Sequence, residues 1–382
     1  MRKEATKYYV LSILLLLISA SLSDASIVDK IKDVVVVTAE RIQGWNLSMH
    51  EALWYEKITG GSVRCQLCPF KCTLSEGQRG MCGVRANVGG KLRAMTYGKP
   101  VAVHIDPIEK KPLFHFLPTS TSYSIATVGC NLSCIFCQNW TISQALPEEG
   151  QHVDLSPGEI ITQAMLNGCK SISYTYSEPT VFFEYMYDTG LLAKQVGIKN
   201  VWVTCGFINP EPLRQLCQVL DAANVDIKGP QSFYQTFTKS LLAPVLQTCK
   251  ILKEEGVWVE ITYLLVPEAN DDPDSIRAIC RWIADSLGKD IPLHFSRFQP
   301  NYKLTDRPPT PVETLHRARQ IALEEGILYV YIGNVPGDEG EDTFCPQTGE
   351  KIIDRTGFWI LDNRLSPDGK CGKNFVVNGV WR

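Results

Sequence analysis

Three cysteines lie close together on one short segment, with the spacing C-x3-C-x2-C: Cys130, Cys134 and Cys137. Three thiolates at this spacing on one loop can ligate three irons of a [4Fe–4S] cluster. The fourth iron then lacks a nearby thiolate, which leaves a coordination position for a small molecule. Structural zinc sites usually take four ligands in two pairs, and disulfides would leave one thiol over. The spacing therefore predicts an iron–sulfur cluster with one open iron.

A second group of four cysteines precedes the first, with the spacing C-x2-C-x3-C-x9-C: Cys65, Cys68, Cys72 and Cys82. Neighbouring glycines allow tight turns around it. Four thiols within eighteen residues suit either Zn²⁺ or a second iron–sulfur cluster. Disulfides are the alternative if the protein is exported. We therefore expect a second metal site, without a choice of metal.

The elements that must position these cysteines are apolar, β-branched runs with the composition of buried strands. They occupy residues 122–128, 171–176, 200–204, 224–227, 257–266, 293–298 and 328–332. Helical patterns lie between them, which predicts a parallel sheet with right-handed crossovers. Six or seven strands fall short of a closed barrel, so we expect an α/β fold, a partial (β/α)6 TIM-like barrel. Its chemistry should lie at the carboxyl ends of the strands.

Two of the helices carry start and stop patterns. Ser156 and Glu159 have the spacing of a capping box, and Gly168 follows as the stop. Thr310 and Glu313 repeat the pattern at a later helix. We therefore expect a helix at each of these positions, and each lies between two predicted strands.

The cluster loop resembles the signature C-x3-C-x-aromatic-C of the radical S-adenosylmethionine (SAM) enzymes, with Phe136 as the aromatic residue. The similarity extends from about Met49 to Trp381 and is to one subfamily, the AmmeMemoRadiSam system radical SAM enzymes, which are related to pyruvate formate-lyase activating enzymes. The matching blocks are residues 106–113, 138–140, 174–180, 225–229, 265–271, 294–298 and 329–334.

The resemblance implies a mechanism and the roles of several residues. SAM would bind the open iron, and its reductive cleavage would give a 5′-deoxyadenosyl radical that abstracts hydrogen from a substrate. By position, Phe136 would pack near the adenine and Glu178 would accept from the SAM ammonium group. Asp226 and Lys228 would contact ribose and carboxylate, and His294 resembles a SAM-contacting histidine. The alternative for these polar residues is a salt-bridged or capped barrel residue. No residue is assigned to acid–base catalysis, and no substrate is indicated.

The same resemblance bears on partners and on competing functions. It implies Memo-like and AMMECR-like partner proteins, and the reductive step needs an electron donor of the flavodoxin or ferredoxin type. Installation of a glycyl radical on a protein is one alternative. A second is an exported, metal- or disulfide-stabilised binding protein that has lost catalysis. A pure electron carrier is disfavoured, because it needs neither Glu178 nor a barrel.

The carboxyl-terminal cysteines depart from the pattern of similar proteins, which often end in two C-x2-C knuckles. Here Cys345 and Cys371 keep one cysteine of each knuckle, so we expect a degenerate zinc-ribbon-like tail with either a disulfide or two free thiols. Five further cysteines fall in helix or strand patterns and are interpreted as buried structural thiols: Cys169, Cys205, Cys217, Cys249 and Cys280.

Composition bounds the remaining possibilities. The 382 residues are 45% apolar and 21% charged, as in globular proteins with a core. A net charge of −3 gives no bulk electrostatic footprint for DNA or an anionic membrane. The expected organisation is a leader at 1–25, a linker at 26–48, a cysteine-rich module at 49–119, the radical SAM barrel at 120–334 and the tail at 335–382.

The amino-terminal pattern indicates export to an oxidising compartment, whereas the spacing of the cysteines indicates reduced thiols that bind metal. A basic stretch precedes an apolar run at residues 10–22, and small residues follow, in the layout of a secretory signal peptide. The run is shorter than the roughly 20 residues that span a bilayer. Iron–sulfur loading, reductant and SAM are cytosolic supplies, which favours cytoplasmic function, and the similarity begins near Met49. Export or membrane association through the leader is the alternative.

Overall fold

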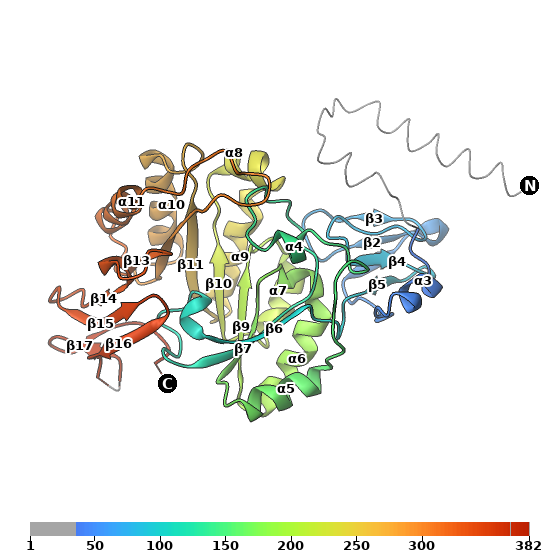
Figure 1. The fold of residues 1–382 in the computed structure, drawn as a ribbon, viewed down its shortest axis with the longest axis horizontal. Coiled ribbons are helices and arrows are strands. Elements are labelled where there is room, and N and C mark those ends of the chain that lie inside the picture. The colour runs from blue at the N-terminus through green and yellow to red at the C-terminus, as the bar shows by residue number, and fades with distance from the viewer. Residues whose placement is uncertain (1–35, 367, 382) are drawn as a thin grey trace, which may run out of the picture. The chain divides into compact units, whose positions relative to one another are not determined.

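The computed structural model describes residues 36–366 and 368–381 (Figure 1). The signal-like leader predicted at 1–25 lies outside these residues. All elements below belong to the unit that begins at Val37. Within the described part of the chain, every helix is too short or too polar to cross a bilayer.

An eight-stranded sheet forms the centre of the molecule, in the order β13-β12-β11-β10-β9-β8-β7-β6. Its strands are β6 (Ala102–Pro107), β7 (Thr121–Ala126), β8 (Ser171–Tyr174), β9 (Lys199–Thr204), β10 (Ala222–Asp226), β11 (Trp258–Leu265), β12 (Leu293–Arg297) and β13 (Val330–Gly333). The strands from β7 to β13 pair in parallel, and β6 pairs antiparallel with β7 at one edge. The open order and the alternation with helices confirm the predicted partial barrel.

The seven parallel strands fall within or next to the predicted apolar runs, because they are covered on both faces. The eighth strand, β6, was not expected. It lies in the range 49–119 assigned to the cysteine-rich module, and its polar residues His104 and Asp106 give it no continuous apolar run. As an edge strand it leaves His104 and Ile105 exposed, which a polar sequence tolerates.

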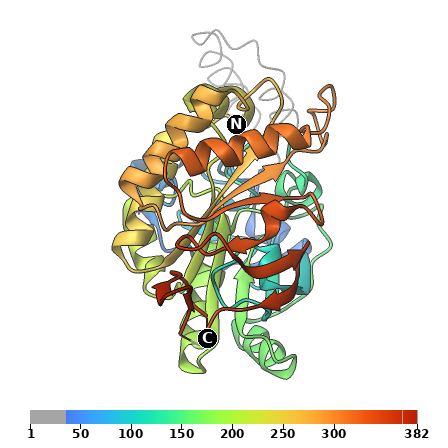
Figure 2. The same cartoon turned by 90° about the vertical axis from the view of Figure 1, so that its left-hand side faces the viewer.

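The connecting helices lie along the outside of the sheet, and Figure 2 shows α10 and α11 packed side by side there. The helices of the barrel are α4 (Trp140–Ser143), α5 (Pro157–Leu166), α6 (Phe183–Gln195), α7 (Pro210–Cys217), α8 (Gln231–Phe233), α9 (Leu242–Glu254), α10 (Pro273–Ser286) and α11 (Val312–Glu324). Single turns complete them: η2 (Ile108–Lys110), η3 (Pro179–Phe182) and the π-helical η4 (Tyr234–Thr238).

The two predicted helix starts have different outcomes. Ser156 and Glu159 form the expected capping box at α5. The predicted cap at Thr310 is wrong, because α11 begins after Pro311 without a side-chain cap. The Thr310 hydroxyl instead donates to the Leu265 carbonyl and accepts from the Phe298 N–H, so it joins two strand ends.

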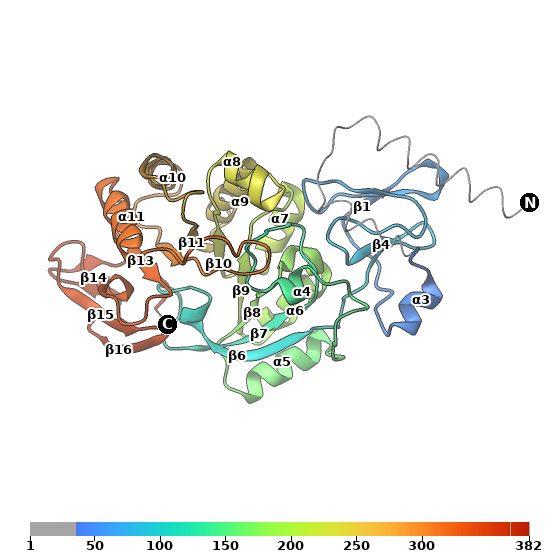
Figure 3. The same ribbon diagram turned by 45° about the horizontal axis from the view of Figure 1, so that its top comes forward.

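The cysteine-rich module before the barrel is built from short strands and turns (Figure 3). Its elements are β1 (Tyr55–Lys57), η1 (Thr59–Gly61), β2 (Val63–Cys65), β3 (Thr73–Leu74), β4 (Arg85–Asn87) and β5 (Leu92–Ala94), and a short helix, α3 (Ala39–Gly44), precedes it in the range predicted as a linker. Strands β1, β2 and β3 form one antiparallel sheet, and β4 pairs with β5. Because these strands are so short, the module is held mainly by its loops and side chains.

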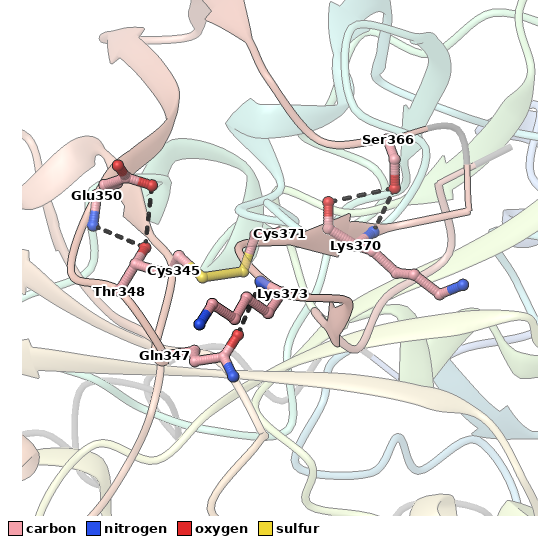
Figure 4. The surroundings of a disulfide bond; sticks show 8 residues. All are labelled: Cys345, Gln347, Thr348, Glu350, Ser366, Lys370, Cys371 and Lys373. Carbon is pink, nitrogen blue, oxygen red and sulfur yellow. Dashed lines mark hydrogen bonds between the residues drawn. A yellow bond between two sulfur atoms is a disulfide. The ribbon is translucent and has the colours of Figure 1, made fainter.

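The carboxyl-terminal tail is also β-rich. It contains η5 (Glu339–Glu341), β14 (Thr343–Phe344), β15 (Lys351–Thr356), β16 (Trp359–Asn363), β17 (Lys370–Cys371) and β18 (Phe375–Val376). Cys345 and Cys371 form a disulfide, one of the two states expected for them (Figure 4). The tail is tied to the barrel by His115, whose Nδ1 lies 2.7 Å from the Asn378 carbonyl and whose Nε2 lies 2.6 Å from the Tyr331 hydroxyl.

Candidate active site

The cluster loop, residues 129–137, follows β7 at the carboxyl edge of the parallel sheet. Gly129 opens it with a φ of +100°, which L side chains rarely adopt. The Gly129 N–H donates to the Ile142 carbonyl at 2.9 Å, and two further N–H groups of the loop donate to carbonyls of η4 at 3.0 and 3.1 Å. The loop is therefore fixed from α4 on one side and from η4 on the other.

The three cysteine side chains of this loop lie in a poorly solvated environment. Cys134 is buried, and Cys130 and Cys137 are half-buried. Burial raises the pKa of Cys134 to about 12, although the nearby Lys228 ammonium opposes the rise. The Leu132 N–H lies 3.3 Å from the Cys130 sulfur, a donor that favours a thiolate there. A bound cation would supply the charge that keeps these sulfurs ionised.

The structure brings Asp226 and Lys228 next to Phe136 of the cluster loop. Lys228 Nζ lies 2.9 Å from Asp226 Oδ2 and 6.0 Å from the centre of the Phe136 ring. Burial alone would lower the pKa of Lys228, but Asp226, Cys134 and Cys205 outweigh it and raise that pKa well above its usual value. These groups form one charged wall at the carboxyl end of β10.

Glu178 lies at the carboxyl side of β8, and both oxygens of its carboxylate accept hydrogen bonds from protein donors. Oε1 accepts from the Thr180 N–H and hydroxyl and from the Thr204 hydroxyl, at 2.6–2.9 Å. Oε2 accepts from the Cys205 N–H at 2.8 Å. With only 2% of the residue exposed, Glu178 acts here as a link between the ends of β8 and β9.

His294 lies in register with Asp226, across Thr262 of β11, and its side chain is engaged in a buried pair. It is the second residue of β12, and its Nε2 lies 2.7 Å from Glu260 Oε2 in a fully buried pair. Glu260 also accepts from the Phe114 and His115 N–H groups, which hold the segment after β6. In this arrangement His294 belongs to a buried network that also leads toward the tail.

Sequence reasoning passed over Cys205, which it took for a core thiol. The residue is buried, as are the other four cysteines in that group. Its sulfur, however, lies 3.7 Å from the Asn131 amide oxygen of the cluster loop. Its position directly after β9, at the carboxyl edge of the sheet, could have indicated this placement.

A cavity beside the cluster loop was also missed. Residues of β6, of η2, of the start of α4 and of the turn after β8 line it: Ala102, His104, Ile105, Asp106, Lys110, Asn139, Ile142 and Tyr176. Tyr176 has a φ of +65°, a strained conformation for an aromatic residue, and its hydroxyl donates to Asp106. The buried Lys111 ammonium lies 2.6 Å from the same carboxylate. Burial lowers the pKa of Lys111 to about 8, although Asp106 opposes this.

The four cysteines of the module surround a separate cavity. Its lining comprises Cys65, Cys68, Cys72 and Cys82 with mostly apolar neighbours. As the side chains stand in residues 36–366 and 368–381, no three His, Cys, Asp or Glu residues are arranged to hold a metal ion. The assignment of both groups of cysteines therefore rests on their donor chemistry and their surroundings.

Comparison with known proteins identifies the family. The radical SAM superfamily matches residues 124–280. An uncharacterized protein of Methanocaldococcus jannaschii is 53% identical over 333 residues, which cover 86% of this chain and 99% of that protein. The chain belongs to the radical SAM superfamily. Membership of this superfamily implies that the protein is an enzyme.

More distant similarities cover part of the chain. The pyruvate formate-lyase-activating enzyme of Listeria monocytogenes is 28% identical over 172 residues, which cover 41% of this chain and 66% of that enzyme. A solved radical SAM methyltransferase from Sphaerobacter thermophilus has a TM-score of 0.45 at 17% identity, over 59% of this chain and 71% of that one.

The radical SAM family implies a [4Fe–4S] cluster and SAM, and the residues present fit both groups. Three thiols on one loop with a backbone N–H directed at Cys130 suit an iron–sulfur cluster. Because Gly129 has no Cβ, the loop passes so close to the module that an added Cβ would lie 2.6 Å from Val84. A zwitterionic nucleoside such as SAM would meet a cation at Lys228, an anion at Asp226 and an aromatic face at Phe136.

Proposed function

We propose that this protein is a radical SAM enzyme that acts on a substrate still to be identified. When bound at Cys130, Cys134 and Cys137, the [4Fe–4S] cluster would supply the electron that cleaves SAM to a 5′-deoxyadenosyl radical, which abstracts hydrogen from the substrate. The observation that carries the proposal is the fixed cluster loop at the carboxyl edge of the sheet with Lys228 beside it.

The chain's own residues would bind and orient SAM. Phe136 would pack against the adenine, and Asp226 and Lys228 would contact the ribose and the carboxylate. Glu178 would accept from the SAM ammonium group at Oε2, which takes one protein hydrogen bond, and its other bonds favour an added role in positioning the Cys205 segment. His294 would reach SAM only through the nitrogen that does not face Glu260.

The substrate would enter through the cavity lined by His104, Lys110 and Tyr176. This cavity borders Asn139, which closely follows the cluster loop, and opens at the exposed edge strand β6. Water would be excluded from the reacting centre once a substrate fills it. The low pKa of Lys111 would leave that residue able to lose a proton near neutral pH, but no proton-transfer role is assigned to it.

A second metal would bind at Cys65, Cys68, Cys72 and Cys82, either as zinc or as a second iron–sulfur cluster. An electron donor of the flavodoxin or ferredoxin type would serve the enzyme. Membership of the AmmeMemoRadiSam subfamily would add Memo-like and AMMECR-like proteins as partners. The supply of iron–sulfur clusters, SAM and reductant favours the cytoplasm as the site of action, with export through the amino-terminal segment as the alternative.

A second candidate function is the installation of a glycyl radical on another protein. The similarity to a pyruvate formate-lyase-activating enzyme favours it. A third candidate is an exported binding protein without catalysis, and the disulfide between Cys345 and Cys371 is the observation in its favour.

Anaerobic purification tests the leading proposal. The protein should be brown and should contain about four irons and four sulfides per chain, or about eight if both cysteine groups bind clusters. Cys134→Ala should abolish the reductive cleavage of SAM to 5′-deoxyadenosine, whereas Cys249→Ala, at a buried helix position, should retain it. A colourless protein with zinc alone, or persistent cleavage by Cys134→Ala, would refute the proposal.

The substrate can be sought with the same preparation. Reconstituted enzyme, SAM and reductant would be incubated with deuterium-labelled proteome or RNA. Transfer of deuterium into 5′-deoxyadenosine should occur with the fraction that contains the substrate. Transfer from a single protein of the extract, with a radical on its glycine, would support the second candidate function instead.

A further inference from the structure

The cavity between the four module cysteines has an apolar shell. Apart from the thiols, its lining is mostly apolar and includes Leu67, Phe70, Leu74 and Val181, while Cys68, Cys72 and Cys82 are each partly exposed. An apolar shell of this kind controls solvent access and hence the reduction potential of a bound centre. The lining therefore suits a redox centre at least as well as a structural ion.

Arg85 gives an independent indication of a bound anionic group in this cavity. The residue lines the cavity and is only 2% exposed. Its terminal nitrogens are paired with Glu184, but its Nε is buried without a hydrogen-bond partner among the described residues. An unpaired buried donor is costly, and a thiolate or sulfide of a metal centre would satisfy it.

The order of the cysteines favours a cluster over zinc. Three cysteines fall within eight residues and the fourth follows after nine more, which is a close run of three with a distant fourth. Plant-type ferredoxins bind their iron–sulfur cluster with such an arrangement. Structural zinc sites more often use two separated pairs.

This cavity shares a wall with the cluster loop. Asn131, the residue after Cys130, lines it. A Cβ on Gly129, the residue before Cys130, would lie 2.9 Å from the Cys82 carbonyl oxygen, so the two backbones are in contact there. The other side of the module reaches the surface, where Met81 is 49% exposed and Lys71 is exposed. The four cysteines thus lie between solvent and the radical SAM site.

We propose that Cys65, Cys68, Cys72 and Cys82 bind an iron–sulfur cluster that relays electrons to the cluster at Cys130, Cys134 and Cys137. This inference rests on the proposed function. One electron would pass from a reduced low-potential carrier, such as flavodoxin, to the module cluster, and then to the cluster of the loop. The module cluster returns to its oxidised state as the loop cluster is reduced. Zinc in the same place could not take part, because it has no second oxidation state.

The metal is tested on the full-length chain after anaerobic reconstitution with iron, sulfide and zinc together. The variant Cys130→Ala/Cys134→Ala/Cys137→Ala should keep about four irons and four sulfides, or two of each for a binuclear cluster. Its electron paramagnetic resonance signal after reduction should not change when SAM is added. One zinc and no iron in this variant would overturn the inference. This measurement does not require SAM cleavage, so it stands apart from the proposed function.

The relay is tested with Cys65→Ala/Cys68→Ala and with the control Cys249→Ala/Cys280→Ala, which removes two buried thiols outside both groups. The first variant should still form 5′-deoxyadenosine with dithionite, which reaches the loop cluster directly, but should lose this activity with reduced flavodoxin. The control should keep both activities. Equal activity with both donors, or loss with both, would overturn the relay. Failure of the unaltered protein with both donors would instead contradict the proposed function.

Discussion

The Arg85 guanidinium lies against the Glu184 carboxylate, with Nη1 2.9 Å from Oε2 and Nη2 2.6 Å from Oε1. Both side chains are almost fully buried. Arg85 belongs to β4 of the cysteine-rich module and Glu184 to α6 of the barrel. The pair therefore joins the module to the barrel through a charged bond that water does not reach.

Removal of one partner should be costly. Arg85→Met should lower the free energy of unfolding by about 3–5 kcal/mol, because it leaves the Glu184 carboxylate buried without its countercharge. Urea unfolding under anaerobic conditions measures this. The double variant Arg85→Met/Glu184→Leu should recover part of the loss. A single variant as stable as the unaltered protein would show that the pair does not hold the module in solution.

The part of the fold that could be predicted from sequence is the part with a continuous apolar pattern. Both faces of the strands from β7 to β13 are buried, so these strands form apolar, β-branched runs that can be recognised in the sequence. Strand β6 could not be found in this way, since an edge strand with His104 and Asp106 has no such pattern. The cap at Thr310 failed for a different reason: a tertiary bond to the Leu265 carbonyl competes with the local one.

From the residues alone, the candidate site could be predicted only where its chemistry is local in sequence, whereas Asp226 and Lys228 were named through the resemblance. The spacing of Cys130, Cys134 and Cys137 indicates a cluster by itself. The orientation of Glu178 and His294 depends on Thr204 and Glu260, which lie 26 and 34 residues away in the chain. Sequence spacing holds no information about such bonds, so roles implied by resemblance did not anticipate them.

Glu178→Gln separates a positioning role from a direct contact with SAM. An amide offers only one accepting oxygen, so the donors at Thr204 and Cys205 cannot both be satisfied. The free energy of unfolding should fall by about 2 kcal/mol. Thermal or urea unfolding without SAM checks this. If stability is unchanged and only the affinity for SAM falls, Glu178 contacts SAM directly and its bonds in the structure give way.

Gly129→Ala should displace the cluster loop. An alanine there would need an unfavourable φ, and its Cβ would lie 2.6 Å from Val84. The variant should lose most of the iron bound at Cys130, Cys134 and Cys137, as measured by iron and sulfide content. Gly197→Ala is the matched control, because its φ is +76° but nothing lies within 4 Å of the added carbon. Equal iron in both variants would mean that the loop can shift without losing its cluster.

His115 should make the stability depend on pH. Burial lowers the pKa of His115 to about 4, while Glu260 and the Asn378 carbonyl oppose the shift. The unfolded chain takes up this proton near pH 6.5, so it binds more protons than the folded protein between pH 6.5 and 4. Stability should be full above pH 6.5 and should fall by about 3 kcal/mol as the pH drops toward 4.

The pH dependence is measured by urea unfolding of the protein and of His115→Gln. The variant should be less stable at pH 7 and should show a weaker fall between pH 6.5 and 4. His152→Gln, at a half-buried surface position, serves as the control and should follow the unaltered protein. The same slope in all three proteins would assign the acid sensitivity to other groups.

The contact between Gly129 and the Cys82 carbonyl has a consequence for how the molecule is assembled. The path of the cluster loop and the path of the segment around Val84 therefore depend on each other. A substitution that moves the segment around Val84 would therefore displace a site that contains none of the module's residues.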